Sequence, residues 1–188
     1  MVQVKSPRGT NTRHWTRAVA GGVGLALLAA PVAHAKPVLR GSNGSYTVSE
    51  FVATTPQRAW TLLTNFDSQA DWAPDIATAR VVKRNGNQLE LQQTYRASYT
   101  FGLPIKARLA ISQQPPKGFS YRLIQGDRLN QLQGSWTITP VKGGVQLRHQ
   151  IQVDPQVPAP LRPIYYDQQE ANLLQWMRIL KQRMEAGG

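Results

Sequence analysis

The sequence predicts an α+β domain in which an antiparallel sheet is followed by one long carboxy-terminal helix. Six runs between residues 76 and 153 alternate apolar and polar side chains, as half-buried strands do. Short turn signals such as Asn85-Gly86 and Gly143-Gly144 separate the runs, and connections this short join antiparallel strands. Residues 164–186 contain neither Gly nor Pro, and their apolar side chains recur with a helical period.

The first 35 residues have the pattern of a secretory signal peptide. Basic residues precede an uncharged run from residue 18 to residue 30, and the small side chains of Ala33 and Ala35 follow it. The alternative is an uncleaved anchor, but a spanning helix needs about 20 apolar residues, and this run is shorter and rich in glycine. We expect cleavage near Ala35 and an extracytoplasmic protein, located in a periplasm or lumen or secreted.

The composition of the remainder limits the kinds of site it can hold. The sequence has no cysteine, which excludes disulfides, thiolate metal sites and a cysteine nucleophile. Four of its 22 Lys and Arg residues and none of its ten Asp and Glu residues lie in the first 35 positions, so the remainder keeps a net charge of about +8. Its length suits one domain, which we expect to be a monomer.

The elements are predicted from residue 36 onward. Residues 36–45 are expected to form a flexible lead-in, and residues 46–186 the domain. A strand is expected over 46–53. Thr55 followed by Pro56 then predicts a helix start, and a second short helix is expected over 67–72. The terminal helix is expected over 163–185, with an apolar stripe formed by Leu173, Trp176, Met177, Leu180 and Met184.

This order of elements resembles the helix-grip fold of the START and polyketide-cyclase (SRPBCC) superfamily. The segment from Ala53 to Trp60 looks like that family's entry into its first helix, and Asp71-Trp72-Ala73-Pro74 is similar to its tryptophan-proline turn. Residues 132–140 with Gly143-Gly144 are similar to the family's late hairpin. The nearest branch is the coenzyme Q-binding and cyclase/dehydrase-like one. The resemblance covers nearly all of residues 46–184, and its motifs are signatures of the fold.

The resemblance implies a sheet curved around the terminal helix, with an apolar cavity between them for a lipid, quinone, hormone or polyketide. Side chains expected on the inner face could line that cavity, or could simply fill the core. The candidate ligand-binding residues are Gln93, Tyr95, Tyr99, Phe101, Tyr121, Trp136, His149, Trp176, Met177 and Leu180.

Groups suited to catalysis are few. His149 is the one histidine beyond residue 35, and it falls in phase with the apolar Leu147 and Ile151, as Gln93 does with its own neighbours. Each could orient a ligand, or could be a core residue with satisfied hydrogen bonds. Asp67, Asp71 and Asp75 are better interpreted as turn residues than as a metal cluster. We predict no catalytic residue, no metal site and no cofactor, since a glycine-rich phosphate loop is also lacking.

The basic charge is scattered and forms no dense run. Arg96, Lys106, Arg108 and Arg148 lie out of phase with the apolar residues, so we expect them on the outer face of the sheet. Nucleic acid is not an expected partner of an exported protein, whereas peripheral contact with an anionic membrane is an alternative use of this charge.

Three functions remain after these exclusions. The first is a binding or carrier protein for a hydrophobic small molecule or lipid. The second is a cyclase or hydratase acting on a polyketide-like substrate, with His149 and a tyrosine or arginine of the cavity in acid-base roles. The third is a structural partner protein of a membrane complex.

Overall fold

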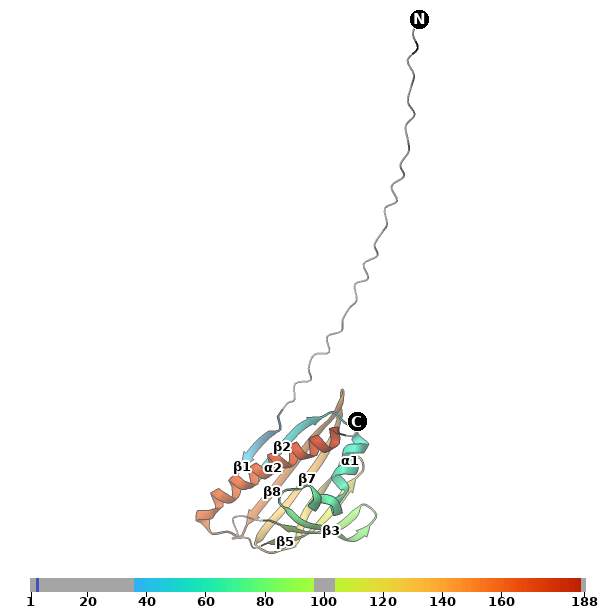
Figure 1. The fold of residues 1–188 in the computed structure, drawn as a ribbon. Coiled ribbons are helices and arrows are strands. Elements are labelled where there is room, and N and C mark those ends of the chain that lie inside the picture. Colours follow the sequence, from blue (N-terminus) through green and yellow to red (C-terminus); the bar gives the residue numbers. More distant parts are fainter. Residues whose placement is uncertain (1–2, 4–35, 97–103, 187–188) are drawn as a thin grey trace. The chain divides into compact units, whose positions relative to one another are not determined.

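The computed structural model of the chain describes residues 3, 36–96 and 104–186. The elements follow the predicted order, with one additional strand at the start (Figure 1). They are β1 (Val38–Ser42), β2 (Ser45–Val52), α1 (Pro56–Thr64), η1 (Phe66–Asp71), β3 (Ile76–Asn85), β4 (Gln88–Tyr95), β5 (Ile105–Gln114), β6 (Gly118–Gly126), β7 (Leu129–Val141), β8 (Gly144–Pro155), η3 (Ala159–Leu161) and α2 (Arg162–Glu185).

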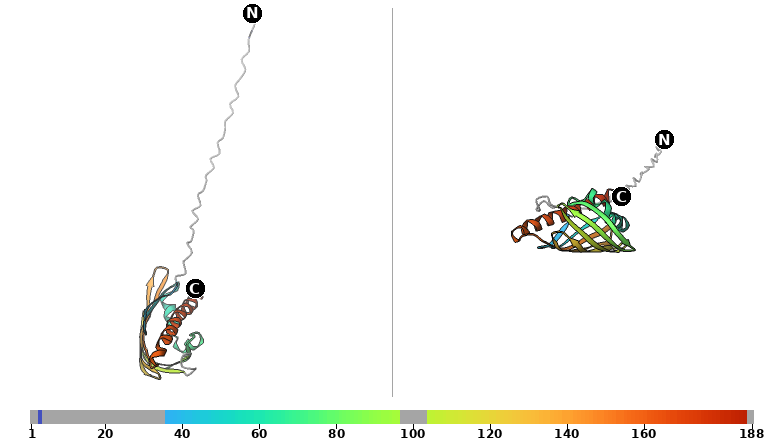
Figure 2. Two further views of the ribbon diagram at one scale, coloured as in Figure 1. Left: turned by 90° about the vertical axis from the view of Figure 1, so that its left-hand side faces the viewer. Right: turned by 90° about the horizontal axis from the view of Figure 1, so that it is seen from below.

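Within the described residues, 36–96 and 104–186, eight strands form one antiparallel sheet in the order β1-β2-β8-β7-β6-β5-β4-β3. The strand β2 pairs with β8 over eight residues, so strands from the start and the end of the domain are neighbours in the sheet. The sheet curves, and α2 lies along its concave face, while α1 and η1 lie beside the helix (Figures 1 and 2). This architecture is the helix-grip fold, as the sequence predicted.

The helix α2 completes the core on the concave side. Its buried residues are Tyr165, Leu173, Met177, Leu180 and Met184, which include four of the five predicted stripe positions, while Trp176 is half-buried. Its carboxy-terminal end is fixed by polar contacts. Arg58 Nε donates to the Met184 carbonyl oxygen at 2.8 Å, and the Ala53 backbone N–H donates to Glu185 Oε1 at 2.9 Å.

The helix α1 begins where the sequence predicted. The Thr55 hydroxyl oxygen accepts a hydrogen bond from the Arg58 backbone N–H at 3.2 Å, and Pro56 occupies the first helical turn. The following 3₁₀ helix η1 corresponds to the predicted second short helix, and it buries Phe66 and Gln69. The Asp67 side chain accepts from the Val81 backbone N–H at 2.8 Å, which ties η1 to β3.

The segment 36–45 differs from the flexible lead-in that we predicted, because it contains β1 and a hairpin turn. Asn43 and Gly44 have φ angles of 51° and 88°, which suit a two-residue hairpin turn, and Ser42 then pairs with Ser45. The run Val38-Leu39-Arg40-Gly41-Ser42 is short and only half apolar, so its alternation is too weak to stand out. The strand β4 ends at Tyr95. The predicted continuation of this strand through Tyr99 and Phe101 lies outside the described residues.

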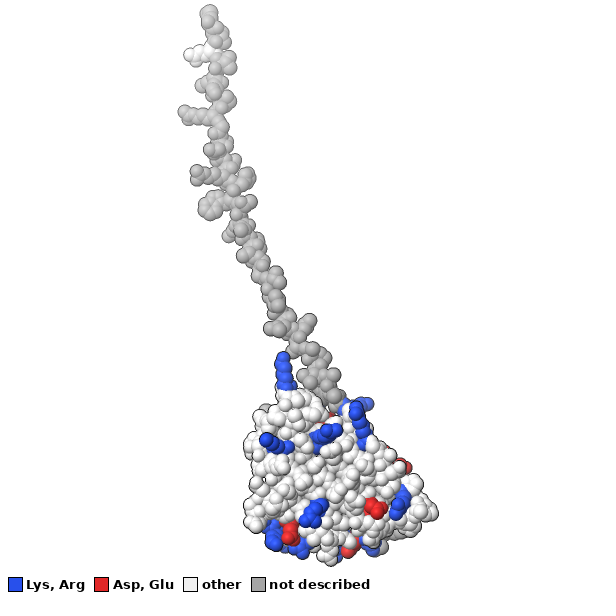
Figure 3. Space-filling view, turned by 180° about the vertical axis from the view of Figure 1, so that it is seen from behind, with Lys and Arg blue, Asp and Glu red and all other residues white. Residues whose placement is uncertain are grey.

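The outer face of the sheet carries only scattered charged side chains (Figure 3). Lys106, Arg108 and Arg148 are exposed there, as predicted, and Arg108 forms an ion pair with Glu90. None of the helices in the described ranges is long and apolar enough to cross a membrane.

A buried carboxyl group lies between the sheet and α2. Glu50 faces inward from β2 with 4% of its surface exposed, and its Oε2 atom has no hydrogen-bond partner among the described residues. Burial raises the pKa of Glu50 to about 7, although the nearby Lys181 partly opposes this shift. Lys181 itself donates to Glu185 and to the Phe51 carbonyl oxygen, so its ammonium group is already engaged by two acceptors.

Replacing Glu50 with Gln is expected to stabilise the protein at pH 8 by about 2 kcal/mol. The folded state holds the Glu50 proton up to about pH 7, whereas the unfolded chain releases it near pH 4.5, so the wild type loses stability as the pH rises between these values. Urea unfolding of both proteins at pH 4.5, 6 and 8 measures the effect. The gain at pH 8 should vanish at pH 4.5, and an equal gain at all three pH values would contradict it.

Candidate functional site: a cavity between the sheet and the terminal helix

A cavity of about 120 Å³ lies between the concave face of the sheet and the amino-terminal half of α2. One buried water needs roughly 10–15 Å³ by the same measure, so the space is large enough for a small organic ligand. Its walls come from β4 to β8, from the start of β3, from η1 and from residues 165–176 of α2. The strands supply a wall of this kind because every second side chain along each of them points inward.

The cavity wall is mostly apolar and contains many aromatic rings. Aliphatic side chains of the strands form much of it, including Leu91, Leu109, Ile111 and Leu132. The aromatic members are Phe66, Tyr95, Phe119, Tyr121, Trp136, Tyr165 and Trp176. Phe66 meets Phe119 edge to face at 5.3 Å between ring centroids. A surface of this composition favours hydrophobic ligands.

The first polar group in the wall is formed by Tyr121 and His149. The Tyr121 hydroxyl lies 2.8 Å from His149 Nε2, and the imidazole stacks on the Trp136 ring at 4.2 Å and 6°. Gly134 permits this arrangement, because a Cβ atom there would lie 2.6 Å from the Tyr121 hydroxyl. Burial lowers the pKa of His149 to about 3 and raises the pKa of Tyr121 far above its usual value, so both groups are neutral at physiological pH.

The second polar group is a hydrogen-bonded chain of Tyr95, Gln93 and Gln69. The Tyr95 hydroxyl donates to Gln93 Oε1, and Gln93 Nε2 donates to Gln69 Oε1, both at 2.6 Å. Gln93 and Gln69 are buried, with 4% and 6% of their surfaces exposed. The chain joins β4 to η1 inside the molecule. This chain gives the buried amide groups of Gln93 and Gln69 hydrogen-bond partners, and it engages the proton of the Tyr95 hydroxyl.

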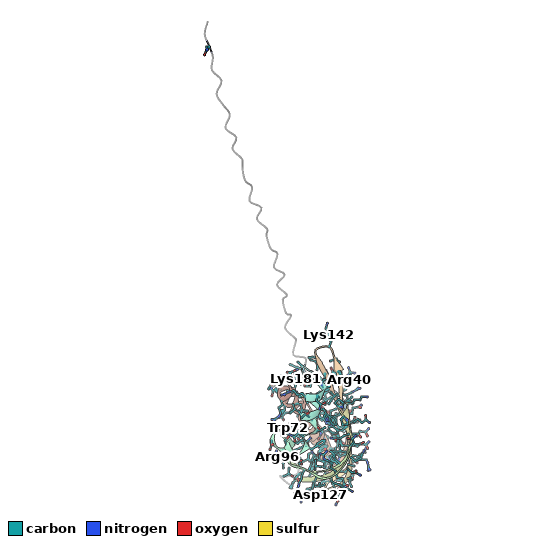
Figure 4. The ribbon with its side chains drawn as sticks, turned by 90° about the vertical axis from the view of Figure 1, so that its right-hand side faces the viewer. Arg40, Trp72, Arg96, Asp127, Lys142 and Lys181 are labelled. Atoms are coloured by element: carbon teal, nitrogen blue, oxygen red, sulfur yellow. The ribbon has the colours of Figure 1, made fainter. Side chains whose placement is uncertain are left out.

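The third polar group contains two charged residues that sequence reasoning did not place here. Trp176 Nε1 donates to Asp75 Oδ1 at 2.6 Å, and burial raises the pKa of Asp75. Arg96 Nη1 donates to the Ile76 carbonyl oxygen at 2.6 Å, on the helix side of the sheet near Trp72 (Figure 4). Because Arg96 is exposed and Asp75 is only half-buried, both mark the solvent side of the cavity.

The position of Arg96 therefore contradicts the prediction that this residue lies on the outer face of the sheet. The strand β4 ends at Tyr95, so the alternation on which that prediction relied stops one residue before Arg96. Asp75 was interpreted as a turn residue, and its position directly before β3 is the reason it reaches the cavity. No pattern in the sequence marks either residue, since both depend on where neighbouring strands end.

The structure brings six of the ten candidate ligand-binding residues together around the cavity: Gln93, Tyr95, Tyr121, Trp136, His149 and Trp176. Met177 and Leu180 are buried in the hydrophobic core and are not part of the cavity wall. Tyr99 and Phe101 lie outside the described residues. Phe66, Gln69 and Tyr165 also line the cavity and were not among the candidates.

Residues 44–185 match the family described as polyketide cyclase / dehydrase and lipid transport. No curated protein matches the chain at the level of sequence.

Solved structures with the same fold include a START superfamily protein from Mycobacterium smegmatis, with 18% identity, a TM-score of 0.58, and coverage of 74% of this chain and 96% of that one. The Zhui aromatase/cyclase from Streptomyces sp. R1128 has 13% identity, a TM-score of 0.64, and coverage of 80% and 99%. A STAR-related lipid transfer protein from Xanthomonas axonopodis has 13% identity, a TM-score of 0.60, and coverage of 78% and 90%. With the match over residues 44–185, the chain belongs to the polyketide cyclase / dehydrase and lipid transport family.

Proposed function

We propose that the protein binds and carries a hydrophobic small molecule or lipid, which it holds in the cavity between the sheet and α2. The observation that supports this function most strongly is an aromatic-rich cavity whose buried polar residues are all uncharged. A quinone, a lipid or a polyketide-like compound has the hydrophobic surface that matches this wall. Such a wall shields a poorly soluble compound from water.

Organic extraction of the purified protein followed by mass spectrometry tests the proposal. The expected result is one class of hydrophobic compound in a stoichiometric amount, which rebinds to the emptied protein. Quinones, fatty acids and carotenoids form the panel for direct binding measurements. Failure to extract any compound, together with no binding across the panel, would rule out the carrier function.

A cyclase or hydratase is the second candidate, favoured by the contact of 2.8 Å between Tyr121 and His149 in the cavity wall. The lowered pKa of His149, about 3, makes it a weak base at neutral pH, so the carrier function has better support. Replacing His149 with Ala separates the two. An enzyme should lose turnover of a polyketide-like substrate, whereas a carrier should show only weaker or altered binding.

We also propose that the protein acts outside the cytoplasm after cleavage near Ala35. The support is the basic, then uncharged, then small-residue pattern of the first 35 residues. Amino-terminal sequencing of protein recovered from an extracytoplasmic fraction should find Lys36 as the first residue. An intact Met1 terminus, or recovery from the cytoplasm alone, would contradict this location.

A further inference from the structure

We propose that Tyr121 donates a hydrogen bond to a carbonyl oxygen of a neutral ligand, and that His149 is the positioning residue that directs this donor into the cavity. The inference rests on the proposed carrier function and narrows its ligand class. It selects ketones, quinones and esters, and it disfavours pure hydrocarbons and ligands whose buried end is charged.

The hydrogen bond between Tyr121 and His149 has a favoured direction. The imidazole is neutral and carries one proton, and His149 Nδ1 is buried without a hydrogen-bond partner among the described residues. If Tyr121 donated to Nε2, the ring proton would sit on Nδ1 as a buried donor with no acceptor. Unpaired buried N–H groups are rarer than under-satisfied acceptors. The favoured arrangement has Nε2–H donating to the Tyr121 oxygen.

The proton of the Tyr121 hydroxyl is then available to a second acceptor. Once the Tyr121 oxygen accepts from Nε2, its own O–H needs another acceptor, and Tyr121 is part of the cavity wall. Donors linked in such a chain polarise one another, which strengthens the outer hydrogen bond. A ligand carbonyl oxygen in the cavity completes the chain.

The charges around the cavity favour a neutral ligand. The buried polar side chains of the cavity wall are Gln69, Gln93 and His149, all of which are neutral. Asp75 and Arg96 lie on the solvent side, and both are already engaged, with Trp176 and with backbone carbonyl oxygens respectively. An ionised group placed beside Tyr121 would therefore lose its hydration without gaining a counter-charge, which is strongly unfavourable.

Ser120 provides a control on the same strand. It directly precedes Tyr121 on β6, but it is exposed on the outer face of the sheet and is not part of the cavity wall. Replacing Ser120 with Ala removes a hydroxyl group that cannot reach the ligand. The two variants therefore separate a specific donor in the cavity from a general effect of altering β6.

Equilibrium dialysis of the full-length protein with 2-acetylnaphthalene and 2-isopropenylnaphthalene tests the donor, because these probes have the same shape and differ in the carbonyl oxygen. The wild type and Ser120→Ala should bind the ketone about tenfold more tightly than the alkene, as one buried hydrogen bond allows. Tyr121→Phe should bind both probes equally. Equal binding by the wild type, or a ketone preference that survives in Tyr121→Phe, overturns the inference and leaves the carrier function standing.

Nitrogen-15 NMR of the ligand-free, full-length protein tests the role of His149 independently of any probe, with the His149 signals assigned by their loss in His149→Gln. We expect the Nε2–H tautomer and no titration of this ring between pH 8 and pH 5. The Nδ1–H tautomer would overturn the inference even if neither probe bound. Absence of binding to both probes and of any extracted compound would instead overturn the carrier function, and the inference with it.

Discussion

Replacing Leu132 with Trp is expected to lower the affinity for the hydrophobic ligand at least a hundredfold, or by about 2.7 kcal/mol. Leu132 faces the cavity from β7 with 7% of its surface exposed, and an indole at this position would occupy space that the ligand requires. Titration of the extracted compound into both proteins measures the loss. Circular dichroism and urea unfolding show whether the variant keeps its fold.

Two further variants make this result interpretable. Val82→Trp introduces the same side chain at an exposed position of β3 and should leave binding unchanged. Leu132→Phe adds less volume and should reduce affinity by a smaller factor, which covers the case in which the indole strains the sheet. Full affinity in a folded Leu132→Trp protein would mean that the ligand binds elsewhere.

Replacing Leu180 with Ala is expected to lower the free energy of unfolding by about 2–5 kcal/mol. Leu180 has 1% of its surface exposed and belongs to the part of α2 that packs in the core, away from the cavity wall. Removing its side chain leaves a void and loses apolar contact between helix and sheet. Urea unfolding at constant pH measures the change.

Gln175→Ala is the matched control, because Gln175 is exposed on the same helix. It should change the free energy of unfolding by less than about 0.5 kcal/mol. A loss below 1 kcal/mol for Leu180→Ala would contradict the role of α2 as a wall of the core.

The inner face of the sheet could be predicted from sequence because side chains alternate strictly along a strand. That rule placed Gln93 and His149 correctly on the buried face, although both are polar. The same rule placed Arg96 wrongly, since it holds only while the strand continues. The strand β1 was missed because five residues that include Gly41 give too short a pattern to recognise.

The helix α2 shows why the cavity itself was harder to predict. Its predicted apolar stripe runs along the helix without a break. Leu173 and Trp176 nevertheless line the cavity, whereas Met177 and Leu180 pack in the core. A helical period identifies which face is buried, but not how far the opposite sheet lies from that face at each turn. The contact between Tyr121 and His149 likewise joins β6 to β8 across β7. No spacing of residues within a short segment of the sequence can therefore predict it.

A crystal structure of the protein with its extracted ligand tests the central claim most directly. We predict that the ligand lies between the sheet and the amino-terminal half of α2, in contact with Trp136 and Trp176, with a carbonyl oxygen within hydrogen-bonding distance of the Tyr121 hydroxyl. A ligand bound on the outer face of the sheet, with the cavity still empty, would contradict the claim that this protein carries its ligand between sheet and helix.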